Sequence, residues 1–219
     1  MKRPLLIAVF GAVIVACAAP AHAAICAPKK LVHAVIAEIT PDIPSSSFAA
    51  QPKEFYRIGS DRLRTEEAAD PGNGIHGVIV VSEPDIWMAN LYDGSGKHIV
   101  DPGPTYFARA PVFGQLLPGK LASLEIGCEP AFIAEFAPNP VRQEQVGSAR
   151  YDVYRVQDGI DAVELLELPG SKAPSFARYF RNGKLVIALR YDLYAADLAE
   201  NPQLFVRPAG IKYEEMKQN

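Results

Sequence analysis

Residues 181–194, RNGKLVIALRYDLY, carry the two signals that decide the fold class. The pair Asn182-Gly183 is typical of a two-residue β-hairpin turn, because both residues tolerate positive φ angles. The apolar residues that follow recur at every second position, which places them on one face of a strand: Leu185, Ile187, Leu189, Tyr191 and Leu193. The segment therefore predicts a hairpin whose second strand is long.

Strand signals of the same kind recur along most of the chain, in residues 31–40, 53–68, 75–92, 131–137 and 149–194. Residues 101–127 are rich in proline and predict only short helical turns, near 112–117 and 120–126. Residues 195–205 predict a short helical cap. No linker divides the chain, so residues 24–219 predict a single, mainly β domain built on one strongly curved antiparallel sheet of about ten strands.

The first 23 residues predict a secretory signal peptide. Lys2 and Arg3 precede an apolar run in residues 5–19, and Ala21-His22-Ala23 supplies the small residues of a cleavage site. The run is shorter than the roughly 20 residues that a membrane-spanning helix needs. We therefore expect an exported, periplasmic protein that begins at Ala24.

One alternative for this N-terminus stays open, because residues 14–17 (IVAC) fit a lipobox in which Cys17 is acylated and anchors the protein to a membrane. Either cleavage leaves Cys26 and Cys128 in an oxidising compartment, where an even pair of cysteines favours a disulfide. Two buried thiols are the alternative to that disulfide. A metal site from two cysteines this far apart is not expected.

Residues 69–81, ADPGNGIHGVIVV, contain the spacing G-x-G-x-x-G, which in dinucleotide-binding proteins opens a helix. Here the third glycine, Gly77, precedes the β-branched run Val78-Ile79-Val80-Val81, which favours a strand. Without a helix N-terminus the loop lacks the free amides that bind a pyrophosphate. We interpret the glycines as hairpin residues and expect no nucleotide cofactor.

Composition and motifs exclude several other functions. The formal net charge of −3 provides no positive field for nucleic acid. His33, His76 and His98 lack metal-ligand spacing, and no catalytic motif is present. We therefore expect no metal site, no cofactor and no enzymatic activity. An enzyme remains a third hypothesis, which would require polar groups brought together inside a cavity.

Three segments resemble the superfamily of periplasmic lipoprotein carriers, LolA and its relatives. Residues 56–66 (YRIGSDRLRTE) are similar to that family's early hairpin, and residues 78–91 (VIVVSEPDIWMANL) are similar to the next two strands. Residues 181–215 resemble its C-terminal end, which closes with L-F-x-x-P-x-G. The resemblance implies an incomplete, unclosed β-barrel around a hydrophobic cavity, with short helices as a lid. Arg64 stands where the family has a strand arginine.

Two functional hypotheses follow from the resemblance and from the strand at residues 84–92, which is apolar on both faces. In the first, the protein carries a lipid or the acyl chains of a lipoprotein in a cavity. In the second, it docks an envelope protein through a surface patch or sheet edge. The residues expected at the ligand site are Arg64, Trp87, Met88, Leu189 and Tyr191.

Overall fold

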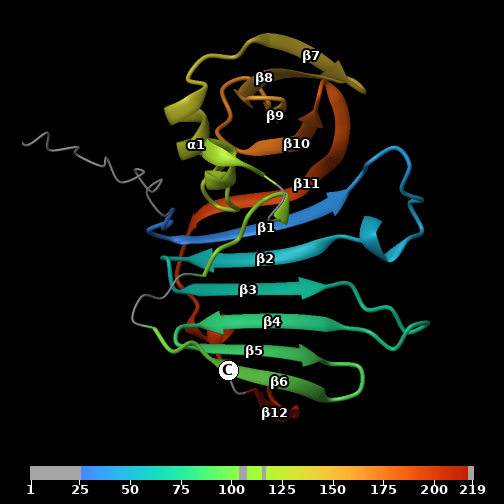
Figure 1. Ribbon diagram of the computed structural model, residues 1–219, viewed down its shortest axis with the longest axis vertical. Helices are drawn as coiled ribbons and strands as arrows, with labels where there is room; N and C mark the ends of the chain where they lie inside the picture. The colour runs from blue at the N-terminus through green and yellow to red at the C-terminus, as the bar shows by residue number, and fades with distance from the viewer. Residues whose placement is uncertain (1–25, 104–107, 115–116, 217–219) are drawn as a thin grey trace, which may run out of the picture.

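The computed structural model describes residues 26–103, 108–114 and 117–216, which form one open twelve-stranded sheet. Figure 1 shows the strands stacked in the order β12-β6-β5-β4-β3-β2-β1-β11-β10-β9-β8-β7. Every neighbouring pair is antiparallel except β12 and β6, which are parallel. The strands are β1 (Leu31–Glu38), β2 (Lys53–Ile58), β3 (Arg62–Glu67), β4 (Gly77–Ser82), β5 (Asp85–Asn90), β6 (Ser95–Val100), β7 (Arg142–Val146), β8 (Ala149–Asp158), β9 (Asp161–Glu167), β10 (Pro174–Arg181), β11 (Lys184–Leu198) and β12 (Lys212–Met216).

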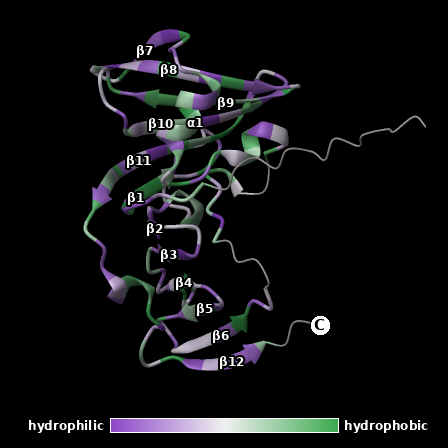
Figure 2. Cartoon of the chain, turned by 90° about the vertical axis from the view of Figure 1, so that its left-hand side faces the viewer, coloured by the Kyte–Doolittle hydropathy of each residue, from purple (hydrophilic) through white to green (hydrophobic). Residues whose placement is uncertain are grey.

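The sheet is strongly twisted and its two ends do not pair with each other. In Figure 2, β8 to β10 run across the view, whereas β2 to β5 are seen nearly end-on. The edge strands β12 and β7 lie at opposite ends of the strand order. The prediction of a mainly β, strongly curved and unclosed antiparallel sheet is confirmed, with twelve strands in the described residues instead of about ten.

The hairpin predicted at Asn182-Gly183 joins β10 to β11, and both residues have positive φ, at 50° and 73°. The predicted single face of β11 is wrong in part. Register shifts against β10 and β1 place one extra β11 residue before Ile187 and another after Tyr191. Because each extra residue reverses the alternation, Leu185 and Leu193 lie on the opposite face from Ile187, Leu189 and Tyr191.

The described helices are short: η1 (Phe48–Ala50), η3 (Gly119–Ser123), η4 (Pro202–Phe205) and α1 (Glu129–Phe136). The strand predicted at residues 131–137 is wrong, because these residues lie in or just after α1. Pro130 occupies the first turn, where its missing N–H costs no hydrogen bond, and Glu129 suits the helix N-terminus. Of the predicted helical turns, 120–126 overlaps η3, and 195–205 forms the end of β11 followed by η4.

Each face of the sheet is covered by a different segment of the chain. We call residues 108–114 and 117–137 the lid, and the sheet face beneath it the inner face. Lid side chains such as Phe113, Leu121 and Leu124 pack there with sheet residues to form the main core. The buried sheet members of this core include Ala34, Ile36, Leu63, Val81, Val156, Val163, Leu165, Ala177, Tyr179, Leu189 and Tyr191.

Residues 199–211 cross the outer face, since they run from β11 at the centre of the sheet to β12 at its edge. Phe205 of η4 packs with Leu31 and Ile58 in a second, smaller core. Figure 2 shows this segment descending on the side of the sheet away from the lid. Apolar side chains on the outer face of β4 are buried as a result, with Val78 1% and Val80 0% exposed.

The lid is fixed to the sheet by covalent and ionic bonds near its end. The predicted disulfide is confirmed: Cys26, before β1, is bonded to Cys128, at the N-terminus of α1, across 102 residues of sequence. Beside it Arg57 of β2, fully buried, pairs with Glu125 of the lid at 2.6 Å. Arg57 also donates hydrogen bonds to the carbonyl oxygens of Cys26 and Ile126, each at 3.0 Å. These bonds hold the second half of the lid against β1 and β2.

The glycine-rich segment is a turn, as interpreted from its sequence. Gly72 and Gly74 lie between β3 and β4, Gly74 has a φ of +67°, and Gly77 is the first residue of β4. No helix within the described ranges is long and apolar enough to cross a membrane. The predicted signal peptide and the alternative lipobox at Cys17 lie outside the described residues.

Candidate functional site

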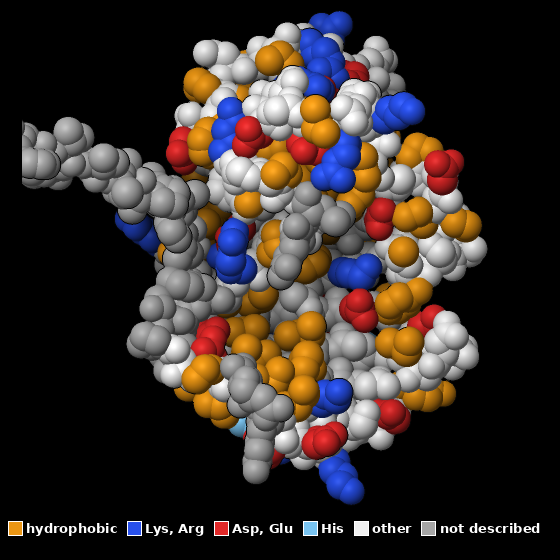
Figure 3. All heavy atoms as spheres, in the orientation of Figure 1, with side chains coloured by type: hydrophobic (Ala, Val, Ile, Leu, Met, Phe, Trp, Pro, Cys, Tyr) orange, Lys and Arg blue, Asp and Glu red, His pale blue; other side chains and the backbone are white. Residues whose placement is uncertain are grey.

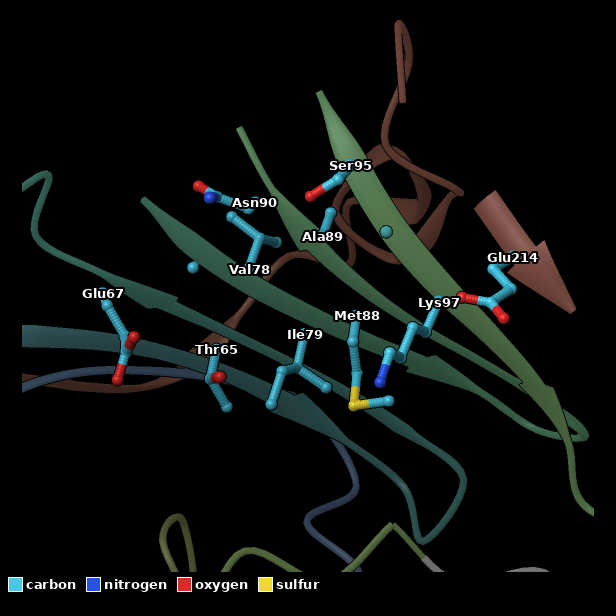
Figure 4. Close-up of a pocket in the computed structure, with 12 residues that line it drawn as sticks. Thr65, Glu67, Val78, Ile79, Met88, Ala89, Asn90, Ser95, Lys97 and Glu214 are labelled. Atoms are coloured by element: carbon cyan, nitrogen blue, oxygen red, sulfur yellow. The ribbon is translucent and has the colours of Figure 1, made fainter. Parts of the chain in front are cut away.

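A groove lies on the inner face beside the lid, over the strands at the β12 end of the sheet. Its floor is a row of residues paired across five adjacent strands: Thr65, Ile79, Met88, Lys97 and Glu214. Directly paired residues on neighbouring strands point to the same side of a sheet. Figure 4 shows Thr65, Ile79, Met88 and Lys97 side by side, projecting into the same space.

The rows on either side of this floor differ in polarity. Toward the lid, the next row contains Leu63, Val81, Ile86, Ile99 and Met216. Leu63 and Val81 are already part of the main core. Away from the lid, the row contains Asn90, Ser95 and Lys212, with Glu67 at its β3 end. The groove therefore changes from apolar beside the core to polar at the strand ends.

The groove is open to solvent, although most of its lining surface is apolar. Its volume is about 520 Å³, which lies in the range of about 300–1,000 Å³ typical of small-molecule pockets. Ile79 is 40% exposed, an unusual environment for an isoleucine at the centre of a paired strand. Figure 3 shows apolar side chains gathered in a hollow on this face, with charged side chains around its margin.

The charged residues that line the groove are Glu67, Lys97 and Glu214. Glu67 lies in the polar row, and Lys97 and Glu214 lie in the floor row on β6 and β12. The apolar stretch between Ile79 and the lid therefore carries no charge of its own. Glu67 also borders the turn into β4, where a side chain at Gly77 would come within 2.7 Å of the Glu67 carboxylate. Glycine at this position keeps the β3–β4 end of the groove open.

The five residues predicted to bind the ligand do not line one cavity. Met88 lies in the groove floor. Leu189 and Tyr191 lie on the inner face, but the lid covers them and each is only 8% exposed. Trp87 and Arg64 alternate with groove residues and therefore lie on the outer face.

On the outer face, Trp87 and Arg64 have partners of their own. The Trp87 ring stacks on His98 with the ring centroids 5.6 Å apart. Arg64 donates to Glu66 at 2.6 Å. The predicted single site required Trp87 and Met88 to share a cavity, which the two-residue period of a strand does not permit.

Sequence reasoning missed Thr65, Ile79 and Lys97 as groove residues. Each lies in a different strand, and only the register of β3, β4, β5 and β6 brings them into one row. The available signal was the apolar alternation of residues 77–91, which identifies the two faces of β4 and β5. It does not identify which of those faces the lid leaves open.

A buried carboxylate on α1 connects the lid to β11. Glu129 is 0% exposed and accepts hydrogen bonds from the hydroxyls of Tyr191 at 2.9 Å and Tyr194 at 3.0 Å. The amide of Gly127 donates to the same carboxylate at 2.8 Å. Burial raises the pKa of Glu129 to about 7, although these hydrogen bonds act in the opposite direction. Protonation of Glu129 near neutral pH therefore changes the charge inside the core.

Among the residues that the structure describes, no group of three or more His, Cys, Asp or Glu side chains is placed to hold a metal ion. The groove lining contains one lysine and two carboxylates, and it lacks a histidine or cysteine. The arrangement is suited to holding an apolar chain against the apolar side of the groove near Ile79 and Met88, with polar groups at its margin.

Comparisons with known proteins identify no family. No protein-family model matches the sequence, and no curated protein matches it. Similar solved structures include an uncharacterized conserved protein from Thermus thermophilus, with 12% identity, a TM-score of 0.48 and coverage of 86% of this chain and 91% of that one. MucB in complex with MucA from Pseudomonas aeruginosa has 13% identity and a TM-score of 0.42, and the match covers 84% of this chain but only 58% of that chain. At these values the likeness supports no conclusion about function.

Proposed function

We propose that this protein is an exported carrier that holds a single apolar chain, from a lipid or from the acyl group of a lipoprotein, in the groove. The observation that carries the proposal is the half-covered inner face. The lid fills the part over β1 and β8 to β11, whereas the apolar residues Ile79, Ile86 and Met88 beside it are left partly exposed. Exposed apolar residues that adjoin one another indicate a binding surface.

An acyl chain fits the groove better than a peptide does, because of how the floor is built. Strands β4 and β5 are paired on both sides, so their backbone N–H and C=O groups are already hydrogen-bonded. An extended peptide lying on this floor would find no backbone partners there, which is costly for those of its N–H and C=O groups that are removed from water. An acyl chain has no such groups. Burying it on the floor gains about 0.8 kcal/mol for each methylene removed from water.

The signal-peptide prediction and the disulfide between Cys26 and Cys128 support an exported protein, because disulfides persist in oxidising compartments. Together with the resemblance to periplasmic lipoprotein carriers, they support a role in lipid or lipoprotein transport in the cell envelope.

Binding of palmitate, measured by calorimetry, tests the proposal. Ile79→Asp places a charge among the apolar residues of the groove, and we expect it to weaken palmitate binding at least about tenfold, which corresponds to about 1.4 kcal/mol. Leu185→Asp is the matched control: Leu185 is 38% exposed, close to the 40% of Ile79, and lies on the outer face. It should leave binding unchanged. Equal affinities of all three proteins would refute the groove as the site.

A second candidate function, docking of another envelope protein, is favoured by the filled core under the lid. Leu189 and Tyr191 are buried by lid side chains, so the described inner face offers an open groove rather than an enclosed cavity. Native mass spectrometry of protein purified from the periplasm, followed by solvent extraction, separates the two functions. A co-purifying lipid supports the carrier. A bound polypeptide with no lipid supports the docking function.

A further inference from the structure

A second hollow lies at the other end of the molecule, between α1 and the strands β8 and β9. Its volume is about 570 Å³. Most of its wall is apolar or uncharged, and the residues that line it are Pro130, Ala131, Ile133, Ala134, Pro138, Tyr154, Glu167, Gly170, Ser171 and Lys172. The groove shares none of these residues, so the two sites are separate.

Glu167 is the carboxylate in the lining of this hollow. It ends β9 and is only 4% exposed. Its Oε1 atom is buried and has no hydrogen-bond partner among the described residues. A buried carboxylate oxygen without a donor is unfavourable, and a native structure that retains one calls for an explanation. Glu164 pairs with arginines, and Glu129 accepts hydrogen bonds from two tyrosines. Glu125 Oε2 also lacks a hydrogen bond, but it lies 2.6 Å from the guanidinium of Arg57, whereas Glu167 has no ion-pair partner in the described structure.

The groups around Glu167 make the hollow electrically negative. Asp152 of β8 is its direct cross-strand partner, and Glu129 lies across from it on α1. Burial, together with the nearby charges of Glu129 and Asp152, raises the pKa of Glu167 to about 7. Tyr154 adds a hydroxyl to the lining. Lys172, in the exposed loop after β9, is the cation in the lining, and none of the ion pairs among the described residues joins it to Glu167.

These observations define the ligand by its chemistry. A negative, buried oxygen without a donor calls for a cation that carries hydrogen-bond donors. A metal ion does not fit, because the described residues place no cluster of three His, Cys, Asp or Glu side chains in position to hold one. The apolar wall formed by Pro130, Ile133 and Pro138 suits a hydrocarbon body attached to the cationic group.

We propose that the hollow between α1 and β9 binds a small protonated amine with an apolar body, whose ammonium group donates to the carboxylate of Glu167. The site is separate from the groove and does not depend on the function proposed there. The ammonium supplies the donor that Oε1 lacks, and the hydrocarbon displaces water from the apolar wall.

Calorimetric titration of the full mature chain with hexylamine, hexanol and hexanoate tests this site. The three probes have bodies of equal length and differ in the charge of one end. At pH 8 we expect hexylamine to bind about tenfold more tightly than hexanol, because a charge-assisted hydrogen bond is stronger than a neutral one. Hexanoate should bind more weakly than either. At pH 5.5 Glu167 is protonated, so the preference for the amine should disappear.

Two variants test whether Glu167 determines the preference for hexylamine over hexanol. Glu167→Gln keeps the size of the side chain and should bind hexylamine and hexanol equally at pH 8. Lys172→Met removes the lining cation and should keep the preference for the amine. Glu135→Gln, exposed on α1 and outside the lining of both sites, is a matched control that should leave hexylamine binding unchanged. A wild-type protein that binds hexylamine no more tightly than hexanol would overturn the proposal. Retention of the preference by Glu167→Gln would overturn it as well.

Discussion

The buried carboxylate of Glu129 should make the protein less stable as the pH rises. Its pKa is raised from the ordinary value of 4.5 to about 7, chiefly by burial. The folded protein therefore holds this proton over a pH range in which the unfolded chain has released it. The raised pKa of Glu129 therefore adds to the free energy of unfolding. This contribution is fully present below pH 4.5 and is lost as the pH rises through about 7.

The size of this effect follows from the two pKa values. Each unit of difference corresponds to about 1.36 kcal/mol, so the titration of this one group lowers the free energy of unfolding by about 2.5 kcal/mol between pH 5 and pH 8. Glu129→Gln keeps the shape of the side chain and removes the titration. The variant should therefore lose about 2.5 kcal/mol less stability over that interval than the wild-type protein.

Urea unfolding at pH 5, 6, 7 and 8, with the disulfide intact, measures this difference. Glu135→Gln is the matched control, because Glu135 is exposed on the same helix. Its pH dependence should follow that of the wild-type protein. If Glu129→Gln and the wild-type protein lose equal stability between pH 5 and pH 8, the carboxylate is already ionised in the folded state. In that case the hydrogen bonds from the two tyrosines outweigh the effect of burial.

Three further predictions concern the bonds that hold the lid and the edge of the sheet. Replacing Cys26 and Cys128 together by alanine should lower the free energy of unfolding by about 2–5 kcal/mol, measured by urea unfolding against the oxidised protein. Glu125→Leu should cost about 3–5 kcal/mol in the same assay, because it leaves the fully buried Arg57 without its anionic partner; a loss below about 1 kcal/mol would show that the pair is not needed. His98 should titrate in NMR spectra with a pKa above its ordinary value of 6.5, because hydrogen bonds to two carboxylates stabilise its charged form. Its contribution to stability should be present at pH values below 6.5 and lost as the pH rises through the raised pKa.

Much of the secondary structure could be predicted from local sequence, because the signals involved are local. A two-residue turn depends on backbone angles that Asn182 and Gly183 adopt without strain, and they do so between β10 and β11. The strand after Gly77 and the disulfide between Cys26 and Cys128 were likewise predicted from residue type and number. Residues 131–137 were misassigned because a short apolar run fits a strand or a helix equally well. The proline that precedes this run favours the helix.

The candidate site depended on information that no single segment contains. Alternation along β5 separates Trp87 from Met88, but it does not say which of them faces the lid. That choice was made by tertiary structure, in which the lid covers one face of the sheet and residues 199–211 cover the other. The register of the strands then placed Ile79 beside Met88 in an uncovered row. Turn and strand preferences act within a few residues, so the local sequence is enough to specify paired strands in this chain. Where an apolar surface stays open depends instead on which distant segments pack over each face of the sheet, and that is settled only when the whole chain folds.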